Sequence, residues 1–346
     1  MKVLLVGNYE ADGQRSMERF GKMLLEGLRE EGIEVEMVRP KVVVGGGNKW
    51  LGYVDKFVLF WVVIWLAGRG KDVVHILDQG NGVYASRRRT CVLNAHDLLA
   101  IRKARGEFAG EKTRFSGRIL QWMILGGLRR AGAIVSVSEA TREDVRRLIG
   151  ESEMIPNAVE DFWKPVEGEK GDYLLHVGGG PWYKNRAGVV RVFIEVRTRT
   201  RHAPRLVMVG PELDETLTGE LKEAGLEGEV TVLTDVTDER LRELYSGARV
   251  LIFPSLAEGF GWPILEAQAC GCPVVTTARE PMRTTGGEAA VYAEPGEWTK
   301  GVIEVLEMSE GRRAALVAAG IENAKRYSVK EFARAYAAFY RRHARR

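Results

Sequence analysis

Cysteine is scarce in this sequence, with 3 residues in 346, and two of them, Cys270 and Cys272, are separated by a single glycine. So few cysteines exclude a disulfide framework, and their spacing does not suggest a zinc site. Long apolar runs are missing as well, since the longest, FVLFWVVIWLA, covers only residues 57–67. A bilayer-spanning helix needs about twenty apolar residues, so no transmembrane helix is expected. A reducing cytoplasm is the expected location.

An excess of charge of one sign is also missing. The 51 basic residues nearly balance the 47 acidic ones, so the composition gives no reason to expect nucleic-acid binding. No signal peptide is expected, because the first residues lead directly into a strand-like run, VLLVG. No loop completes a G-x-G-x-x-G fingerprint, which argues against an NAD-dependent dehydrogenase. No D-x-D pair follows a predicted strand, so we expect no metal site.

What the sequence does contain is the pattern of an α/β protein. Its 346 residues allow two domains, at the usual size of about 100–200 residues each. Short apolar runs that end in glycine or polar loops alternate with helical segments, as in sheets of parallel strands. A segment rich in charge and glycine, residues 161–171, is interpreted as a linker. We expect domains at residues 1–160 and 161–328, followed by a final helix over residues 329–346.

The most informative stretch is residues 249–277, RVLIFPSLAEGFGWPILEAQACGCPVVTT. It predicts a buried strand, a polar loop, a helix with Pro263 at its start, and a second strand. In such a unit the backbone amides of residues 259–261 lie beyond the carboxyl end of the strand, where ligands bind. Glu258 and Glu266 flank this segment, and carboxylates accept paired hydrogen bonds from sugar or ribose hydroxyls.

This stretch resembles the E-x7-E signature of the family 4 retaining glycosyltransferases. The two acids are Glu258 and Glu266, with EGFG, a proline and ACGCPVV in register. The resemblance implies a GT-B fold, in which two Rossmann-like domains face each other across a cleft and the second domain binds the donor. It further implies donor binding by Glu266, Gly259, Phe260 and Gly261 and a catalytic role for Glu258. The alternative is an ordinary Rossmann-type unit with solvated acids.

The segment VGGGPWYKN resembles the phosphate-binding stretch of the same family. This implies that Lys184 neutralises the donor diphosphate while Gly178 and Gly179 let backbone amides approach it. Gly210 is expected beside the nucleobase. The chain lacks the arginine that many relatives carry after the first glycine, and Arg283 is one candidate for the missing charge. The alternative is that Lys184 is an ordinary surface lysine.

The first half contains a His-Asp pair, AHDL, that resembles the family's H-D motif and implies that His96 contacts the donor sugar. Gly13, in the loop after the first strand, is expected near the donor phosphates, although it could instead only turn the chain into the next helix. For His75, in the strand before that of the His-Asp pair, a role in the site and a purely structural role are equally open. The residues expected on the acceptor side are His75, Asp78 and Arg102.

The apolar run over residues 57–67 has two interpretations. One is a buried helix. The other is a helix that lies in a membrane surface, because Trp61 and Trp65 share a face and basic residues follow. The arginine run at residues 87–89 adds to a secondary hypothesis of an anionic acceptor or anionic lipid headgroups.

Together these features predict a retaining, metal-independent hexosyltransferase. It would move a mannose- or glucose-type sugar from a nucleotide diphosphate donor to a hydroxyl of a glycan or lipid-linked acceptor, in polysaccharide or glycolipid biosynthesis. Glu258, His96 and Lys184 would be catalytic, and no cofactor is expected beside the nucleotide sugar. A peripheral contact at the inner face of the membrane is a secondary hypothesis. Two alternatives stay open: another GT-B enzyme, such as an epimerase or phosphorylase, and a non-catalytic nucleotide-sugar-binding partner.

Overall fold

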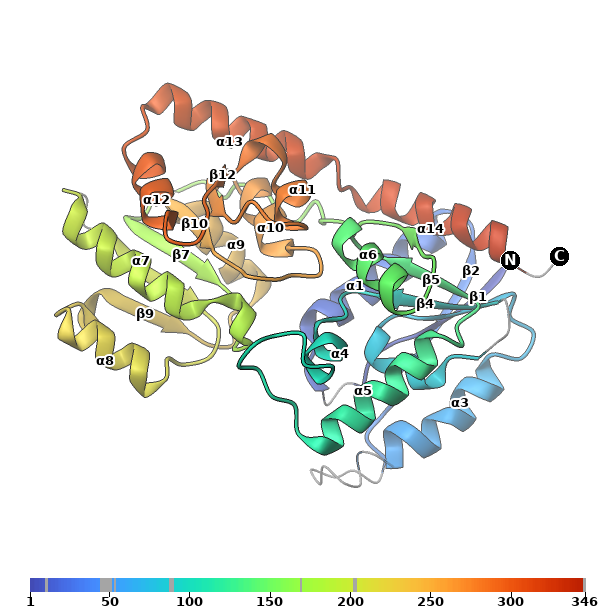
Figure 1. The fold of residues 1–346 in the computed structure, drawn as a ribbon. Coiled ribbons are helices and arrows are strands. Elements are labelled where there is room, and N and C mark those ends of the chain that lie inside the picture. The colour runs from blue at the N-terminus through green and yellow to red at the C-terminus, as the bar shows by residue number, and fades with distance from the viewer. Residues whose placement is uncertain are drawn as a thin grey trace. The chain divides into compact units, whose positions relative to one another are not determined.

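The structure is a computed structural model that describes residues 1–9, 12–43, 52, 54–86, 90–168, 170–201 and 204–344. The chain divides into two compact units, shown in Figure 1. Unit 1 comprises Met1–Ala158 and Val329–Arg346, and unit 2 comprises Val159–Ser328. The first boundary lies two residues before the one expected from sequence, and the second coincides with it. The arginine run at residues 87–89 lies outside the described residues.

Unit 1 is built on a sheet of parallel strands in the order β2-β1-β3-β4-β5-β6. Residues 3–6 are apolar and fully buried, because helices cover both faces of the sheet. The strands are β1 (Lys2–Val6), β2 (Glu34–Val38), β3 (Val73–Ile76), β4 (Cys91–Ala95), β5 (Ala133–Ser136) and β6 (Glu153–Met154).

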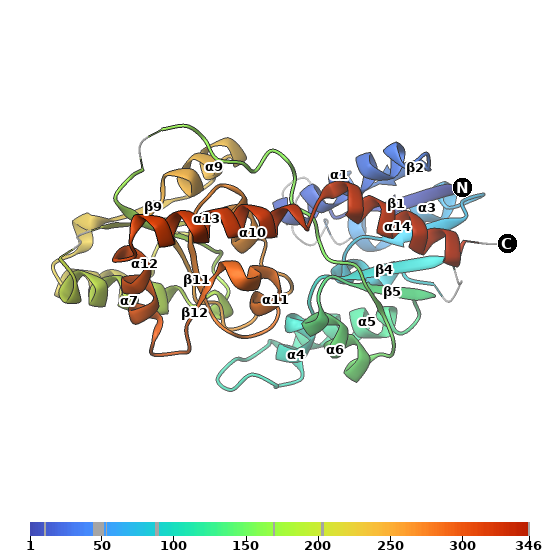
Figure 2. The same ribbon diagram turned by 90° about the horizontal axis from the view of Figure 1, so that it is seen from above.

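One face of this sheet is covered by α1 (Arg15–Glu30) and α14 (Val329–His343), which lie along each other in Figure 2. The other face packs against α3 (Phe60–Ala67), α5 (Phe115–Leu128) and the 3₁₀ segment η3 (Gln79–Tyr84). Two further helices, α4 (Leu99–Ala104) and α6 (Glu139–Leu148), follow β4 and β5. Because the strands are parallel, the loops that follow β1, β3, β4 and β5 lie at the same side of the sheet.

The last helix belongs to unit 1, although the chain reaches it only after unit 2. Its aromatic stripe is buried against the sheet and α1. The Tyr340 hydroxyl lies 2.6 Å from Nδ1 of His75, and the Tyr336 hydroxyl donates to Oδ1 of Asn94 at 2.7 Å. These polar contacts fix the position of α14 on β3 and β4.

The same contacts correct the prediction for His75. This residue lies within β3, is fully buried, and has Nε2 3.1 Å from Oδ1 of Asn94. Burial lowers the pKa of His75 to about 3, so the ring is neutral. Because both ring nitrogens are engaged by neighbours inside unit 1, His75 joins the last helix to the sheet and does not face an acceptor.

The apolar run over residues 57–67 is not a buried helix. It forms most of the π-helical segment η2 (Asp55–Leu59) and all of α3, and within α3 only Phe60 and Ile64 are buried. Trp61 and Trp65 are 42% and 59% exposed. The buried-helix interpretation is therefore wrong, and the surface interpretation stays a prediction.

Unit 2 is built on a second parallel sheet, in the order β12-β11-β10-β7-β8-β9. All strands run in the same direction, so the loops that follow β7, β8 and β10 lie at the same side of the sheet, at the carboxyl ends of the strands. The strands are β7 (Tyr173–Val177), β8 (Arg205–Val209), β9 (Val230–Leu233), β10 (Val250–Phe253), β11 (Val274–Thr276) and β12 (Val291–Tyr292).

Helices cover both faces of this sheet too. The main core lies between the sheet and α7 (Arg186–Arg199), α8 (Glu215–Glu223) and α12 (Trp298–Leu306). Three other helices pack together, namely α9 (Asp238–Gly247), α10 (Trp262–Ala269) and α13 (Glu310–Lys325). A short helix, α11 (Met282–Gly286), connects β11 to β12.

Candidate functional site

The residues predicted to bind a donor in unit 2 meet where the adjacent strands β7 and β10 end. The backbone N–H of Leu256 donates to the carbonyl of Tyr183 at 2.7 Å. The side chain of Asn185 donates to the carbonyl of Pro254 at 3.1 Å. Two loops that are far apart in the sequence are thus joined at the carboxyl edge of the sheet, where ligands bind in folds of this class.

A partly buried ion pair lies at this junction. Nζ of Lys184 is 2.8 Å and 2.9 Å from the two carboxylate oxygens of Glu258. The side chains are 18% and 8% exposed, and the Phe253 ring lies 5.5 Å from the ammonium group. In such a poorly hydrated place, charge-assisted hydrogen bonds are stronger than in water. A cation and a hydroxyl acceptor are therefore fixed side by side, as a sugar phosphate requires.

Glycine is required where the loops after β7 and β8 approach each other. Gly210 has a φ of +149°, and a Cβ there would lie 2.3 Å from the carbonyl oxygen of Gly178. A Cβ on Gly178 would lie 2.7 Å from Nε2 of His176. Any larger residue would clash at these two positions. The backbone at the carboxyl ends of β7 and β8 therefore carries no side chain at Gly178 and Gly210.

His176 lies under this glycine loop and is fully buried. Burial lowers the pKa of His176 to about 4, so the ring is neutral. Its Nδ1 donates to the carbonyl of Ile252 at 3.0 Å, which leaves Nε2 as an acceptor. Within the described part of the chain this Nε2 has no hydrogen-bond partner.

Arg186, the first residue of α7, is a candidate that the sequence analysis missed. Its Nη1 and Nη2 atoms are closed off from solvent and have no hydrogen-bond partner among the described residues. A Cβ on Gly210 would lie 3.3 Å from Nη1. Lys184 and Arg186 both lower the pKa of His176, so two cations lie near the same histidine. A buried, unpaired guanidinium is costly, and an anionic ligand would remove that cost.

Burial also lowers the pKa of Arg186 itself, and Asp214 and Glu212 oppose this effect. The residue retains its charge at neutral pH, because arginine is not deprotonated in proteins. The sequence contained one indication of its role: the arginine expected after the first glycine was missing, and Arg186 stands two residues after Lys184.

The remaining residues predicted from the EGFG segment lie around the start of α10. Gly261 precedes this helix with a φ of +98°, and the Phe260 side chain packs against the rings of Trp262 and Tyr327. Glu266, in α10, is 4% exposed, and its Oε2 accepts a hydrogen bond from the Tyr245 hydroxyl at 2.9 Å. The Glu266 carboxylate is thus fixed in one orientation, and its contact with ribose stays a prediction.

Arg283, the cation predicted from the sequence, packs against Tyr292. Its guanidinium lies 4.6 Å from the centre of the Tyr292 ring, and its carbonyl accepts a hydrogen bond from the Tyr292 hydroxyl at 3.0 Å. Tyr292 belongs to β12, the edge strand, which is separated from β7 by β11 and β10. The role of Arg283 as the missing cation stays a prediction, and Arg186 is a second candidate for that role.

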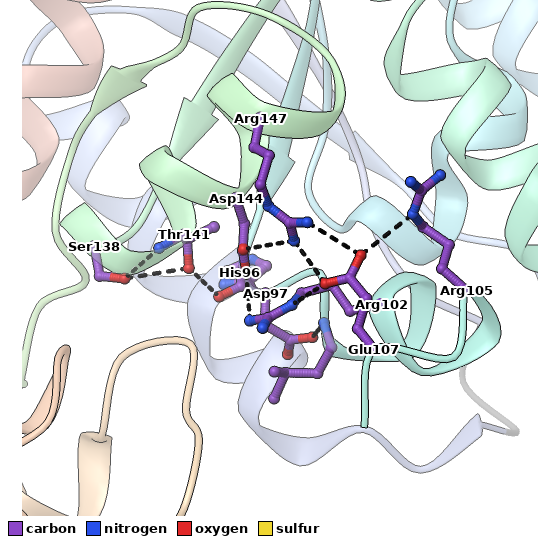
Figure 3. Close-up of polar contacts among 10 residues, drawn as sticks. His96, Asp97, Arg102, Arg105, Glu107, Ser138, Thr141, Asp144 and Arg147 are labelled. Atoms are coloured by element: carbon purple, nitrogen blue, oxygen red, sulfur yellow. Dashed lines mark hydrogen bonds and ion pairs between the residues drawn. The ribbon is translucent and has the colours of Figure 1, made fainter. Parts of the chain in front are cut away.

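The His-Asp loop of unit 1 is held tightly, as Figure 3 shows. Nε2 of His96 donates to the carbonyl of Leu77 at 2.8 Å, and the ring meets Phe20 edge-on at 4.7 Å. The His96 carbonyl accepts a hydrogen bond from the Thr141 hydroxyl at 3.1 Å. Burial lowers the pKa of His96, so the ring is neutral. The sequence-based role of His96 toward the sugar remains a prediction.

Asp78 ties two loops of unit 1 together. Its Oδ1 accepts from the backbone N–H of Gly80 at 2.5 Å, and its Oδ2 accepts from the Asn8 side chain at 2.6 Å. Gly13, which precedes α1, has a φ of +60° and open space where a Cβ would be. Both residues therefore lie in loops at the carboxyl ends of the strands, and their contacts with a ligand stay predictions.

Arg102 belongs to a charge network between α4 and α6, drawn in Figure 3. It donates to Glu107 and to Asp144, in both cases at 3.0 Å. Arg147 donates to Glu107 at 2.7 Å, and Arg105 donates to it at 3.2 Å. Three arginines thus share two acids, and the network keeps one net positive charge.

This network makes a testable contribution to stability. The hydrogen bonds from Arg147 and Arg102 lower the pKa of Glu107 from 4.5 to about 2. Because the folded-state pKa is lowered, the stabilisation is present above pH 4.5 and is lost as the pH falls toward 2. We expect Glu107→Gln to lower the melting temperature at neutral pH and to match wild type near pH 2. Thermal unfolding across this pH range measures the difference.

The matched control is Glu143→Gln, which breaks an exposed pair with Arg146. Exposed pairs contribute little, so this variant should follow wild type at every pH. A Glu107→Gln melting curve that also follows wild type at neutral pH would contradict the prediction.

Comparison with known proteins identifies the family. The family model described as glycosyl transferases group 1 matches residues 158–335, about half of the chain, including Lys184, Glu258 and Glu266. The chain belongs to the group 1 glycosyl transferases. The model described as Glycosyltransferase Family 4 matches residues 17–161. The family resemblance expected from the E-x7-E segment is thereby confirmed.

Curated relatives of this group 1 glycosyl transferase include O-antigen chain mannosyltransferase B of Escherichia coli. It is 27% identical over 231 residues, which are 61% of each chain. The D-inositol 3-phosphate glycosyltransferase of Mycolicibacterium smegmatis is 33% identical over 133 residues, which are 37% of this chain and 30% of that protein. The chain thus spans about three-fifths or less of the length of these relatives.

Solved structures show the fold of this glycosyl transferase. Sucrose-phosphate synthase from Thermosynechococcus elongatus has a TM-score of 0.76 at 18% identity, covering 99% of this chain and 98% of that one. Anabaena HepE in complex with UDP and glucose has a TM-score of 0.71 at 15% identity, covering 98% of this chain and 99% of that one. The predicted GT-B fold is confirmed.

Proposed function

We propose that this group 1 glycosyl transferase moves a hexose of the mannose or glucose type from a nucleotide diphosphate sugar to a hydroxyl acceptor. The observation that carries this proposal is the Lys184–Glu258 pair at the carboxyl end of the sheet that also carries Gly178 and Gly210. The relative that is an O-antigen mannosyltransferase and the HepE complex with UDP and glucose support a hexose donor. Retention of the anomeric configuration follows from the resemblance to family 4.

Lys184 and Arg186 would neutralise the diphosphate. When the bond between the sugar and the β-phosphate breaks, negative charge grows on the leaving phosphate oxygens. Cations that are fixed before the reaction stabilise that charge more than they stabilise the ground state, so they raise turnover. With two such cations available, we propose that the reaction needs no metal ion.

Glu258 would bind hydroxyls of the sugar, and Glu266 would bind the ribose hydroxyls. When the phosphate attracts the Lys184 ammonium, the Glu258 carboxylate gains free acceptor capacity for the sugar. His96 and Gly13 keep the roles toward the donor that the family resemblance implies. The acceptor would be a glycan or a lipid-linked glycan, as in polysaccharide or glycolipid biosynthesis.

The role of Glu266 has a specific test. In Glu266→Gln the amide oxygen can still accept from Tyr245, but the charge that strengthens a bond to ribose is lost. We expect nucleotide binding to weaken by about 10- to 100-fold, with little change in melting temperature. Isothermal titration calorimetry measures the affinity.

The matched control is Tyr245→Phe, which removes the buried hydroxyl and keeps the carboxylate charge. It should lower stability more than it weakens nucleotide binding. If Glu266→Gln bound nucleotide as tightly as wild type, the ribose role would be wrong.

The proposed function is tested first by thermal shift with UDP, GDP, ADP and their hexose conjugates. A ligand at one hundred times its Kd adds about 2.7 kcal/mol of stability, which is readily measured. A hit names the base, and donor consumption with acceptor panels then tests transfer. No shift with any nucleotide would contradict the donor site. Binding without turnover would indicate a non-catalytic partner, and donor epimerisation without an acceptor would indicate an epimerase.

A further inference from the structure

Unit 1 exposes an unusual concentration of large apolar side chains. Among the described residues, eleven of the sixteen exposed large hydrophobic side chains belong to η2, α3 and α5. Trp65 is 59% exposed, Trp122 is 74% exposed and Phe115 is 78% exposed. We call this set the apolar patch: Val58, Leu59, Trp61, Val62, Val63, Trp65, Leu66, Phe115, Ile119, Trp122 and Met123.

The patch is continuous across its two helices. Trp61 on α3 and Trp122 on α5 line the same hollow of about 350 Å³, together with Val83 and Met123. The Trp61 ring also meets the Tyr84 ring of η3 edge-on, with centroids 5.8 Å apart. Figure 1 shows α3 and α5 side by side at one side of unit 1. The two helices therefore present one surface.

The composition of α3 does not suit a helix that faces water. A surface helix of a globular protein has a polar outer face, whereas every residue of α3 is apolar. Only Phe60 and Ile64 of this helix are buried. Exposed apolar area of this extent marks an interaction site. In the described part of the chain no helix is long and apolar enough to cross a membrane.

The two segments that carry the patch contain basic residues and no acidic ones, although Lys56 pairs with Asp12 and Lys71 with Glu36. Residues 56–71 and 112–130 contain no Asp or Glu, although the whole chain has 47 of them. In the turn after α3 the Arg69 guanidinium lies 3.7 Å from the centre of the Trp65 ring, and Arg118 is exposed within α5. The basic residues of the two segments are Lys56, Arg69, Lys71, Lys112, Arg114, Arg118, Arg129 and Arg130.

We propose that the apolar patch docks unit 1 onto the surface of an anionic lipid bilayer. Helices α3 and α5 would lie in the interfacial plane, with tryptophans at headgroup depth and arginines at the lipid phosphates. Tryptophan and arginine are suited to this depth because each combines an apolar body with a polar end. The inference goes beyond the proposed reaction and does not depend on it, since docking needs neither donor nor acceptor.

The charge pattern favours a bilayer over a second copy of the chain. In a two-fold symmetric dimer the same surface meets itself. Residues 112–130 would then face an equally basic segment, and like charges at an interface cost several kcal/mol. Anionic headgroups instead neutralise these residues.

The test is co-sedimentation with vesicles of phosphatidylcholine alone or mixed with phosphatidylglycerol. We expect wild type to bind the mixed vesicles, to bind phosphatidylcholine weakly, and to be released as salt is raised. Trp65→Glu and Trp122→Glu should each lower the partition coefficient by about tenfold or more, because each removes an aromatic side chain that the bilayer would bury. Both side chains are largely exposed, so both variants should fold.

The matched control is Met154→Glu, which places the same charge at an exposed apolar residue of β6, outside the patch. It should bind vesicles like wild type. Arg118→Glu should reduce binding to the mixed vesicles and leave binding to phosphatidylcholine unchanged.

Three outcomes would overturn the proposal: no binding of wild type to the mixed vesicles, equal binding by the tryptophan variants, and equal loss in the Met154→Glu control. A wild-type dimer that separates in the tryptophan variants, with no vesicle binding, would assign the patch to self-association instead. The thermal shift with nucleotides is recorded on the same samples. It reports on the donor site separately, so failure of docking and failure of the proposed function are distinguished.

Discussion

Lys184→Ala is expected to lower the turnover number about 10²- to 10³-fold, the usual effect of removing one preorganised charge or donor from a developing anion. The lysine ammonium lies 2.8 Å from Glu258 at the edge of the sheet, where little water competes for it. The loss should fall mainly on kcat, because leaving-group charge grows in the transition state. Steady-state kinetics with the donor found by thermal shift measure both constants.

The variant also leaves Glu258, at 8% exposed, without its cation. A stability loss of about 1.5–3 kcal/mol is expected from this hydrogen-bonded charge alone. The double variant Lys184→Ala/Glu258→Gln should recover most of that stability and none of the turnover. Lys325→Ala removes an exposed lysine that pairs with Glu322 on α13, and it should leave both the stability and the turnover number unchanged. Full activity of Lys184→Ala would contradict the assignment.

Arg186→Met is expected to have opposite effects on stability and on ligand binding. Nη1 and Nη2 of Arg186 are buried without a hydrogen-bond partner among the described residues, so the free protein should gain about 1 kcal/mol without them. Nucleotide diphosphate binding should weaken by about 10- to 100-fold, since a charge-assisted contact to phosphate is lost. Such a divergence is typical of a residue kept for function at a cost in stability.

Thermal unfolding with and without nucleoside diphosphate measures both effects on one sample. The matched control is Arg191→Met on the same helix, where the arginine is 63% exposed and pairs with Glu220. The Arg191→Met variant should change neither the stability nor the nucleotide affinity by much. The anion-binding role would be wrong if Arg186→Met lost stability and bound the nucleotide as wild type does. That result would show that the guanidinium supports the fold.

The sequence could predict that Lys184 and Glu258 follow strands of one sheet, but neither their ion pair nor the burial of the Arg186 nitrogens. Apolar runs bounded by glycine and proline predict β7 and β10, and parallel strands bring their loops to one edge. Burial of the Arg186 nitrogens depends on the backbone of Gly210, which comes from a different strand. From sequence alone, an arginine at a helix start is usually a solvated residue, so its burial could not be read from the local pattern.

Two errors in unit 1 have a similar origin. The pattern around His75 predicts a strand, but not that its side chain meets Tyr340, a residue 265 positions away. Likewise, the run over residues 57–67 is apolar on every side, and periodicity does not show which of those sides the protein itself covers. In both cases burial is decided by residues outside the segment: Tyr340 contacts His75, whereas no described part of unit 1 covers the outer side of α3.

The position of α14 has a consequence for how the chain is made. Ribosomal synthesis releases residues 329–346 only after all of unit 2, so His75 and Asn94 cannot contact Tyr340 and Tyr336 until unit 2 has been translated. Domains are generally completed from the amino terminus onward during translation. Here the carboxyl-terminal unit can be finished first, and a premature stop after residue 328 would damage the unit at the opposite end of the chain.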